Sequence, residues 1–244
     1  MCGRYAIIDG KKVLESFRTL HVKDPQALFR SVPRYNAAPM QLLPVFAVRH
    51  DELAVQPMQW WLIPHWSKDG KPSATTFNAK SETVHTSRLF APYFKASRCL
   101  VPADAFYEWK AVGRGSGTMS AGGPPEKAPG GKQPFCIRMN DRQPFMFAGL
   151  FSIWKTSSGE EMPSFTILTT TPNPVVSSIH NRMPVILPEE HFDRWLDRAF
   201  KDVEALKRML QPYPAEQMTV FPVSKLVNNV RNDVPDCLSG EGTT

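Results

Sequence analysis

Residues 42–60 read LLPVFAVRHDELAVQPMQW, and this segment contains two candidate strands in immediate succession. Leu42–Arg49 and Leu53–Trp60 are separated only by His50-Asp51-Glu52. A connection of this length joins neighbouring antiparallel strands, so we expect a β-hairpin here.

Further strand candidates lie on both sides of this hairpin, and helix candidates are inserted between them irregularly. The chain has no regular β-α alternation, no G-x-G-x-x-G motif and no P-loop. We therefore expect an α+β protein with mainly antiparallel strands curled into a partly open barrel, and with peripheral helices. The other strand candidates are Tyr5–Ile8, Arg98–Pro102, Pro134–Met139, Pro144–Trp154, Ser164–Thr170 and Met218–Val223; the helix candidates are Lys11–Leu20, Asp24–Arg30, Ser81–Val84, Phe90–Ala96, Asn173–Ile179, Pro188–Leu196 and Lys201–Leu210.

The composition is that of a soluble globular protein, with 42% hydrophobic and 21% charged residues among 244. No apolar run approaches the roughly 20 residues of a membrane span, and the chain does not start like a signal peptide. We therefore expect no membrane partner and a cytoplasmic, nucleoid-associated location. The four cysteines are widely spaced without a CxxC pair, which argues against a zinc ribbon and suits a reducing compartment.

The net charge of +6 and the pI near 9.2 favour a polyanionic partner such as nucleic acid. Many basic enzymes never bind DNA, however, and no run of Lys and Arg here is longer than two. Charge alone leaves both interpretations open. Val112–Gln133 is dominated by Gly, Pro and Ser, so we expect a flexible surface loop within a domain.

The start of the chain, Met1-Cys2-Gly3-Arg4-Tyr5, offers unusual chemistry. Removal of Met1 would leave Cys2 with a free α-amine beside its thiol, with ordinary pKa values of about 8 and about 8.5. Such a 1,2-aminothiol condenses with an aldehyde to an imine and then closes to a thiazolidine. The alternative is an arbitrary residue in a disordered start.

Two aromatic segments contain further candidates. Trp60, Trp61 and Trp66 lie within seven positions. Such a cluster can form a surface on which DNA bases stack, although packing in the core is the commoner role. Glu108 lies between Tyr107 and Trp109. Flanking rings would raise the pKa of its carboxyl and suit it to acid-base chemistry, whereas a strand-face glutamate would simply pair with a lysine.

His180 follows the expected helix that starts at Asn173, and it lies two residues before Arg182. A histidine beside an arginine has the means to move protons and to contact a phosphate. A hydrogen-bonded structural histidine is the alternative.

Six motifs in this order together resemble the SOS-response-associated peptidase (SRAP) family, whose members cap abasic sites in single-stranded DNA. The resemblance runs from Cys2 to about Cys237 and implies a single domain over residues 1–237, interrupted by the 112–133 loop and followed by a disordered tail at 238–244. The motifs are Cys2-Gly3-Arg4-Tyr5, Arg34-Tyr35-Asn36-Ala37-Ala38-Pro39, Trp60-x-Leu62-Ile63-Pro64-x-Trp66, Asn78-Ala79-Lys80-Ser81-Glu82, Val101-Pro102-Ala103-Asp104-x-Phe106-Tyr107-Glu108-Trp109 and Ile179-His180-x-Arg182-Met183-Pro184.

The resemblance implies a role for each matched residue. Cys2, exposed once Met1 is removed, would form a thiazolidine cross-link with the aldehyde of an abasic site, with AP-lyase activity and removal of Met1 as further activities. Asn78 would hold the terminal residue, while Glu108 and His180 would move protons. DNA contacts would come from Arg4, Lys80, Arg182 and Trp66. The family implies a monomer with abasic single-stranded DNA as its partner and with neither a metal nor a cofactor.

The chain departs from the family pattern in places. Lys80 stands where an arginine is usual, so a bidentate phosphate contact becomes a point charge. Trp61 and Ala105 each occupy a usual glycine position, and the loop has no assignable counterpart. Two other classes remain open, namely an N-terminal-nucleophile amidohydrolase and a non-covalent single-strand binder.

Overall fold

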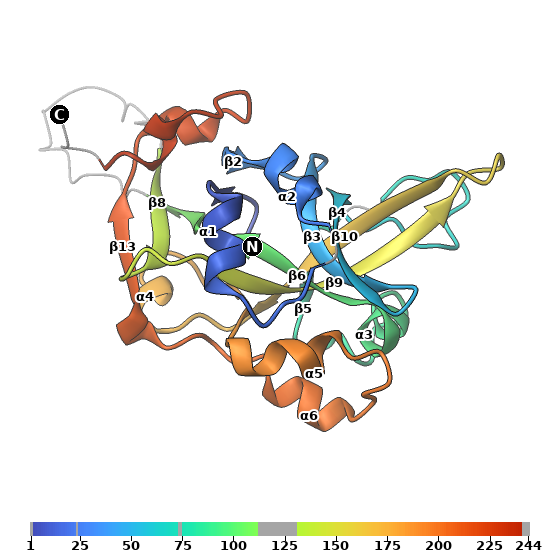
Figure 1. Cartoon of the computed structure of the whole chain (residues 1–244). Coiled ribbons are helices and arrows are strands. Elements are labelled where there is room, and N and C mark those ends of the chain that lie inside the picture. Colours follow the sequence, from blue (N-terminus) through green and yellow to red (C-terminus); the bar gives the residue numbers. More distant parts are fainter. Residues whose placement is uncertain (1, 23, 73–74, 112–130, 241–244) are drawn as a thin grey trace, which may run out of the picture.

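The computed structural model describes residues 2–22, 24–72, 75–111 and 131–240. Within these ranges, thirteen strands form two sheets, with short helices around them (Figure 1). One sheet has the order β13 (Met218–Pro222), β8 (Lys132–Met139), β7 (Ala105–Ala111), β1 (Tyr5–Ile7) and β2 (Arg34–Ala37). The other has the order β11 (Met183–Pro184), β10 (Glu161–Thr170), β4 (Glu52–Trp60), β3 (Leu42–Arg49), β6 (Arg98–Ala103), β9 (Phe145–Lys155) and β12 (Ile186–Leu187), with β5 (Asn78–Lys80) also paired to β10.

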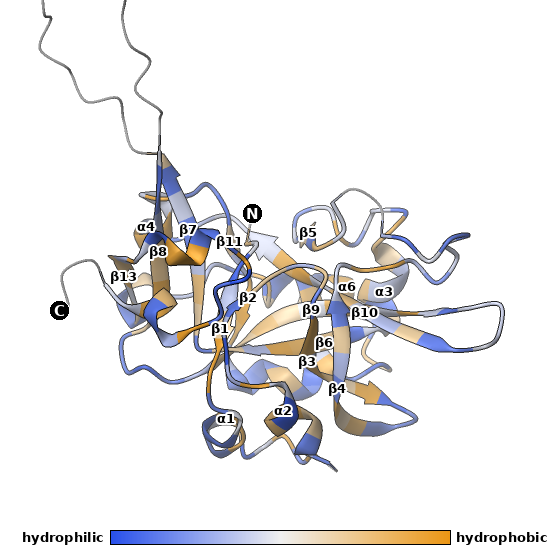
Figure 2. Cartoon of the chain, turned by 90° about the horizontal axis from the view of Figure 1, so that it is seen from above, coloured by the Kyte–Doolittle hydropathy of each residue, from blue (hydrophilic) through white to orange (hydrophobic). Residues whose placement is uncertain are grey.

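The second sheet closes on itself. Strand β10 pairs antiparallel with β9 and parallel with β4, so β10, β4, β3, β6 and β9 form a ring. The first sheet remains open beside this ring. The expected α+β fold with a partly open barrel is therefore confirmed, and Figure 2 shows hydrophobic residues along the strands of the barrel.

The hairpin expected at residues 42–60 forms β3 and β4, which pair from Leu42–Gln59 to Arg49–Glu52. At its tip, His50 and Asp51 both have positive φ angles, of 50° and 62°. Two-residue hairpin loops of this kind match the right-handed twist of the flanking strands. The pairing therefore continues to the last residue of β3.

The helices are shorter than the sequence pattern predicts. Helix α1 starts after Asp9, whose side chain accepts hydrogen bonds from two backbone N–H groups of the first turn. The helix expected at Ser81–Val84 is absent, and these residues form turns. The helices are α1 (Gly10–Ser16), α2 (Gln26–Ser31), α3 (Ala91–Ala96), α4 (Pro174–Ser177), α5 (Phe192–Leu196) and α6 (Val203–Arg208), with single 3₁₀ turns at Glu189–His191, Ala215–Gln217, Lys225–Asn228 and Pro235–Leu238.

The core places the start of the chain against the barrel. Tyr5 packs its ring against Trp60, with centroids 5.2 Å apart, and edge-on against Phe147 at 5.8 Å. Trp60 in turn stacks on Phe165. These rings are fully buried, so the burial of Tyr5 fixes the position of the residues before it.

Two expected mobile segments overlap the described residues only in part. Lys132 and Gln133, expected in the loop, belong to β8 and pair with β7. In the expected C-terminal tail, Gly240 pairs with Val223, and the N–H of Ser224 donates to the carbonyl of Ser239. Residues 112–130 and 241–244 of these two predictions lie outside the described residues. Across the described parts of the chain, no helix has the length and apolar character needed to cross a membrane.

Candidate active site

A pocket with a volume of about 610 Å³ lies beside the start of the chain, and its walls combine two strands of the first sheet with segments outside the strands. Strands β7 and β8 contribute one wall, and the segments before β5 and after α4 contribute another. The pocket therefore lies where distant parts of the chain converge. Its lining consists of Gly3, Arg4, Phe77, Glu108, Trp109, Lys132, His180 and Asn228.

Cys2 directly precedes the pocket residue Gly3, and its side chain is fully buried. Its Sγ is 3.9 Å from the carbonyl oxygen of Arg4, within reach of a weak S–H hydrogen bond. Burial, together with the negative charge of Glu108, raises the pKa of the Cys2 thiol. The thiol is therefore protonated near neutral pH and needs a base before it can act as a nucleophile.

Glu108 is the buried carboxyl of the site, with an exposed fraction of 3%. Burial raises the pKa of its carboxyl to about 8. The sequence predicts this rise from the flanking rings, but only Trp109 lines the pocket. The Tyr107 hydroxyl donates instead to the carbonyl of Tyr35. A carboxyl with this pKa is mainly protonated at pH 7 and can both give and take a proton.

His180 faces Glu108 across the pocket. Its Nδ1 lies 3.8 Å from Oε1 of Glu108, and the backbone N–H of Arg182 donates to Nδ1 at 3.1 Å. Burial lowers the pKa of the imidazole, so the neutral ring prevails at pH 7. Neutral imidazole and protonated carboxyl form a pair suited to proton transfer.

Asn78 occupies the first position of β5, which pairs with β10. Its Nδ2 donates to the carbonyls of Phe77 at 3.0 Å and of Ile167 at 3.4 Å. Its Oδ1 is buried without a hydrogen-bond partner among the described residues. A buried acceptor of this kind is costly unless a donor reaches it.

The expected DNA-contacting residues divide into two groups. Arg4 lines the pocket, but its guanidinium donates to Oδ1 of Asn36 at 2.8 Å and to the carbonyl of Val227 at 2.5 Å. Arg182 forms a bidentate ion pair with Glu82. Lys80 is exposed, and so is Trp66, with an exposed fraction of 61%. Both guanidinium groups therefore already have partners within the protein, whereas Lys80 and Trp66 are exposed.

Four pocket residues, Phe77, Trp109, Lys132 and Asn228, were not expected from the sequence to contribute to the site. Lys132 falls in the 112–133 segment expected to be a loop, and Asn228 belongs to none of the expected strands, helices or motifs. Trp109 was noted only as a neighbour of Glu108; its Nε1 donates to Oδ1 of Asn228 at 2.7 Å, and Arg4 stacks over its ring. No local pattern marks Lys132 or Asn228, because Lys132 reaches the pocket through the pairing of β8 with β7, and Asn228 ends the 3₁₀ turn Lys225–Asn228.

Trp61 has a φ of 141°, in the region that favours glycine. This backbone conformation explains why a glycine suits the position. The Trp61 ring lies edge-on to Phe77 with centroids 5.2 Å apart. Because Phe77 lines the pocket, Trp61 supports the pocket wall from behind.

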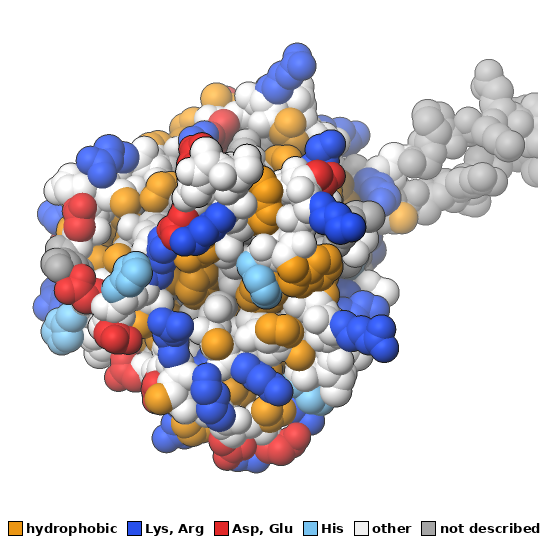
Figure 3. All heavy atoms as spheres, turned by 90° about the vertical axis from the view of Figure 1, so that its right-hand side faces the viewer, with side chains coloured by type: hydrophobic (Ala, Val, Ile, Leu, Met, Phe, Trp, Pro, Cys, Tyr) orange, Lys and Arg blue, Asp and Glu red, His pale blue; other side chains and the backbone are white. Residues whose placement is uncertain are grey.

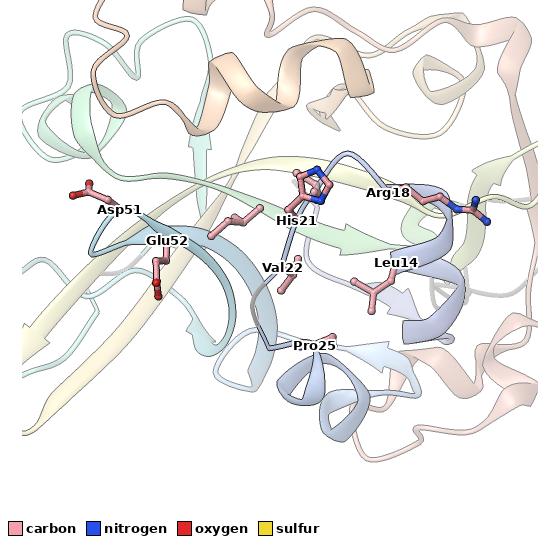
Figure 4. A pocket seen from close by; sticks show the side chains of 9 residues that line it. Leu14, Arg18, His21, Val22, Pro25, Asp51 and Glu52 are labelled. Carbon is pink, nitrogen blue, oxygen red and sulfur yellow. The ribbon is translucent and has the colours of Figure 1, made fainter.

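A second pocket, of about 760 Å³, lies between the end of α1 and the β3–β4 hairpin. In Figure 4 the charged ends of Arg18, Asp51 and Glu52 point in different directions rather than toward one point. Within the described ranges, no cluster of three or more His, Cys, Asp or Glu side chains is placed to hold a metal ion.

The fold and the first pocket define a class of protein: a small β-barrel with a cysteine at position 2 beside a buried glutamate and a histidine. The family model described as SOS response associated peptidase (SRAP) matches residues 1–230, and the chain belongs to this family. The abasic site processing protein YoqW of Bacillus subtilis is 34% identical over 239 residues, which cover 98% of this chain and 99% of that protein.

More distant relatives extend this comparison. The abasic site processing protein HMCES of Gallus gallus is 34% identical over 277 residues, covering 98% of this chain and 77% of the relative. A crystal structure of a protein from Bacteroides thetaiotaomicron has a TM-score of 0.78 at 22% identity and covers 98% of this chain and 100% of that one. This last likeness concerns the fold alone.

Proposed function

We propose that this protein caps abasic sites in single-stranded DNA through a covalent thiazolidine link to Cys2. One observation carries the proposal: the Glu108 carboxyl and the His180 imidazole lie 3.8 Å apart in a pocket that Gly3 also lines, and Glu108 is near enough to the buried Cys2 thiol for its charge to raise the thiol pKa. The names of the relatives YoqW and HMCES as abasic site processing proteins support the same substrate.

The reaction requires a free α-amine on Cys2 and hence the removal of Met1. The amine attacks the C1′ aldehyde of the open-chain sugar, and loss of water gives an imine. The thiol then adds to C1′, and its proton ends on the ring nitrogen. The net change joins one aldehyde and one aminothiol and releases one water, with no oxidation or reduction.

Proton transfer in these steps falls to Glu108 and His180. Protonated Glu108 donates a proton to the hydroxyl of the carbinolamine that the α-amine and the aldehyde form, and this hydroxyl leaves as water. The resulting carboxylate then takes the proton of the Cys2 thiol, whose pKa is raised by burial and therefore requires a base. His180 assists the opening of the sugar ring, and Oδ1 of Asn78 accepts a hydrogen bond from the α-amine.

The DNA backbone would lie against the exposed cations. Lys80 and Lys132 would contact phosphates, and Trp66 would stack on a base. Figure 3 shows Lys and Arg side chains spread around a hollowed face that also exposes hydrophobic and histidine side chains. We propose that the protein acts as a monomer on nucleoid DNA in the cytoplasm.

Two further activities follow from the same residues. The imine at C1′ acidifies the C2′ protons, so elimination of the 3′ phosphate gives AP-lyase activity whenever ring closure is slow. Removal of Met1 by the protein itself would expose the α-amine on which the capture depends.

The decisive experiment is denaturing gel electrophoresis of the purified protein with single-stranded DNA that contains one abasic site. We expect a complex that survives SDS and boiling, with a mass equal to protein plus DNA minus one water. DNA without the abasic site is the control. Release of the DNA on denaturation would support a non-covalent binder, and turnover of amide substrates without a complex would support an amidohydrolase.

A further inference from the structure

Glu82 and Arg182 form a bidentate ion pair, and Arg182 lies two residues after the pocket residue His180. Nη1 and Nη2 of Arg182 donate to the two carboxylate oxygens of Glu82 at 2.5 and 2.9 Å. Nη2 also donates to the carbonyl of Thr169 at 2.6 Å. Only 14% of the Arg182 side chain is exposed, so the guanidinium is held from two sides.

The backbone of Arg182 contacts His180 directly. Its N–H lies 3.1 Å from Nδ1 of His180, and its carbonyl oxygen lies 3.2 Å from the same nitrogen. Unprotonated Nδ1 accepts from the N–H, and protonated Nδ1 donates to the carbonyl. Both forms of the ring therefore find a partner without rotation, which suits a group that gains and loses a proton.

We infer that Glu82 is a positioning residue for His180. Glu82 holds the Arg182 side chain and thereby fixes the position of the Arg182 backbone. At this position, Nδ1 of His180 can gain or lose a proton without rotation of the imidazole ring. The inference rests on the proposed function, because it assigns His180 a proton-transfer role. Glu82 itself does not touch the DNA in this scheme.

The charges around His180 give the inference a measurable consequence. The ring lies 3.8 Å from Glu108. Burial is the main cause that lowers the pKa of the imidazole, the hydrogen bond with the Arg182 backbone raises it, and the positive charges of Lys132 and Arg182 lower it further. Arg4 also lines the pocket, although its guanidinium is bonded to Asn36. The negative charge of Glu82 offsets that of Arg182, so loss of Glu82 should lower the pKa of His180 further.

The test compares Glu82→Gln with Glu161→Gln. Both substitutions remove one carboxylate from an arginine pair, and the pair of Glu161 with Arg49 at 2.7 Å belongs to the β3–β9–β10 end of the barrel. Two quantities are measured on full-length protein lacking Met1: the pH titration of His180 by nitrogen NMR without DNA, and the rate of cross-linking to abasic single-stranded DNA.

We expect Glu82→Gln to move the His180 titration to lower pH. We also expect it to slow cross-linking by about tenfold, which corresponds to the lower end of the free energies for hydrogen bonds to charged groups. Glu161→Gln should change neither quantity. An unchanged titration in Glu82→Gln would overturn the inference. Tighter binding of intact single-stranded DNA with an unchanged titration would also overturn it and would make Glu82 a competitor of phosphate for Arg182. A shifted titration in a protein that never cross-links would support the positioning role and refute the proposed function.

Discussion

Two pockets of this molecule differ in what they bury. The pocket between α1 and the β3–β4 hairpin is the larger, at about 760 Å³ against about 610 Å³. Its ionisable residues Arg18, His21, Asp51 and Glu52 are all exposed, so water solvates their charges. The smaller pocket adjoins a buried thiol and contains a carboxyl that is 3% exposed. Burial of ionisable groups, rather than volume, distinguishes the candidate active site.

Cys2→Ala should give the largest effect, a complete loss of the stable cross-link. Alanine, like cysteine, is small enough at position 2 for Met1 to be removed, so the variant keeps a free α-amine. Imine formation should therefore persist, with some strand nicking and an adduct that borohydride traps. Denaturing gels with and without borohydride measure both outcomes. A stable cross-link in Cys2→Ala would contradict the scheme and would indicate a lysine nucleophile instead.

Glu108→Gln should slow cross-linking by about 10²–10⁴-fold, the range typical of a general acid or base. The amide keeps the volume of the carboxyl but cannot exchange a proton. The initial rate of complex formation at pH 7 measures the effect, and circular dichroism confirms folding. The matched control is Glu52→Gln in the larger pocket, which should react at the wild-type rate. Equal rates for both variants would remove the distinction between the pockets.

The same substitution should change stability in a pH-dependent way. The pKa of Glu108 is about 8 in the folded protein against an ordinary value of 4.5, so the unfolded chain loses this proton first. Stability contributed by the protonated carboxyl is present below pH 4.5 and is lost as the pH rises through 8. Glu108→Gln should therefore raise the free energy of unfolding by on the order of 5 kcal/mol at pH 8.5, with little change at pH 4. Urea denaturation at both pH values tests this, and a larger gain at pH 4 would contradict it.

The barrel and the site were predictable from the sequence to different extents. The β3–β4 hairpin was predictable because its strands and its turn are adjacent in the chain. Closure of the ring by the parallel pairing of β4 with β10 was not, since its partners Trp60 and Phe165 are far apart in sequence. At the site, Cys2, Glu108 and His180 came from motifs that the family resemblance joined.

What the motifs could not reveal is how their side chains pair. Glu82 and Arg182 each belong to a recognised motif, but 100 positions separate them, and nothing local predicts their ion pair. The prediction of Arg182 as a phosphate contact therefore overlooked its competing partner. Lys132 was hidden for another reason, because it follows a Gly- and Pro-rich segment and enters the pocket only through pairing with Ala111.

Lys80 and Arg182 should differ in their contribution to DNA binding. A phosphate contact on single-stranded DNA contributes about 0.7 to the slope of log K against log[salt]. Lys80→Gln should flatten the slope by about that amount, because Lys80 is exposed. Arg182→Gln should flatten it less, since Glu82 already neutralises the guanidinium. Fluorescence anisotropy with intact single-stranded DNA over a salt series measures both slopes. An equal loss in the two variants would mean that DNA displaces Glu82.

The smallest effect is expected in the larger pocket. Arg18→Gln and His21→Gln change residues that are exposed at the end of α1, where surface substitutions typically alter stability by less than about 0.5 kcal/mol. Neither residue faces the buried carboxyl or the thiol, so cross-linking and nicking should proceed at wild-type rates. The salt slope is the sharper measurement, because Arg18→Gln removes a positive charge from a protein of net charge +6. A slope flattened by about 0.7 would place a phosphate at this pocket. It would also extend the DNA path from the active site to the far side of the β3–β4 hairpin, and the two pockets would then serve one function.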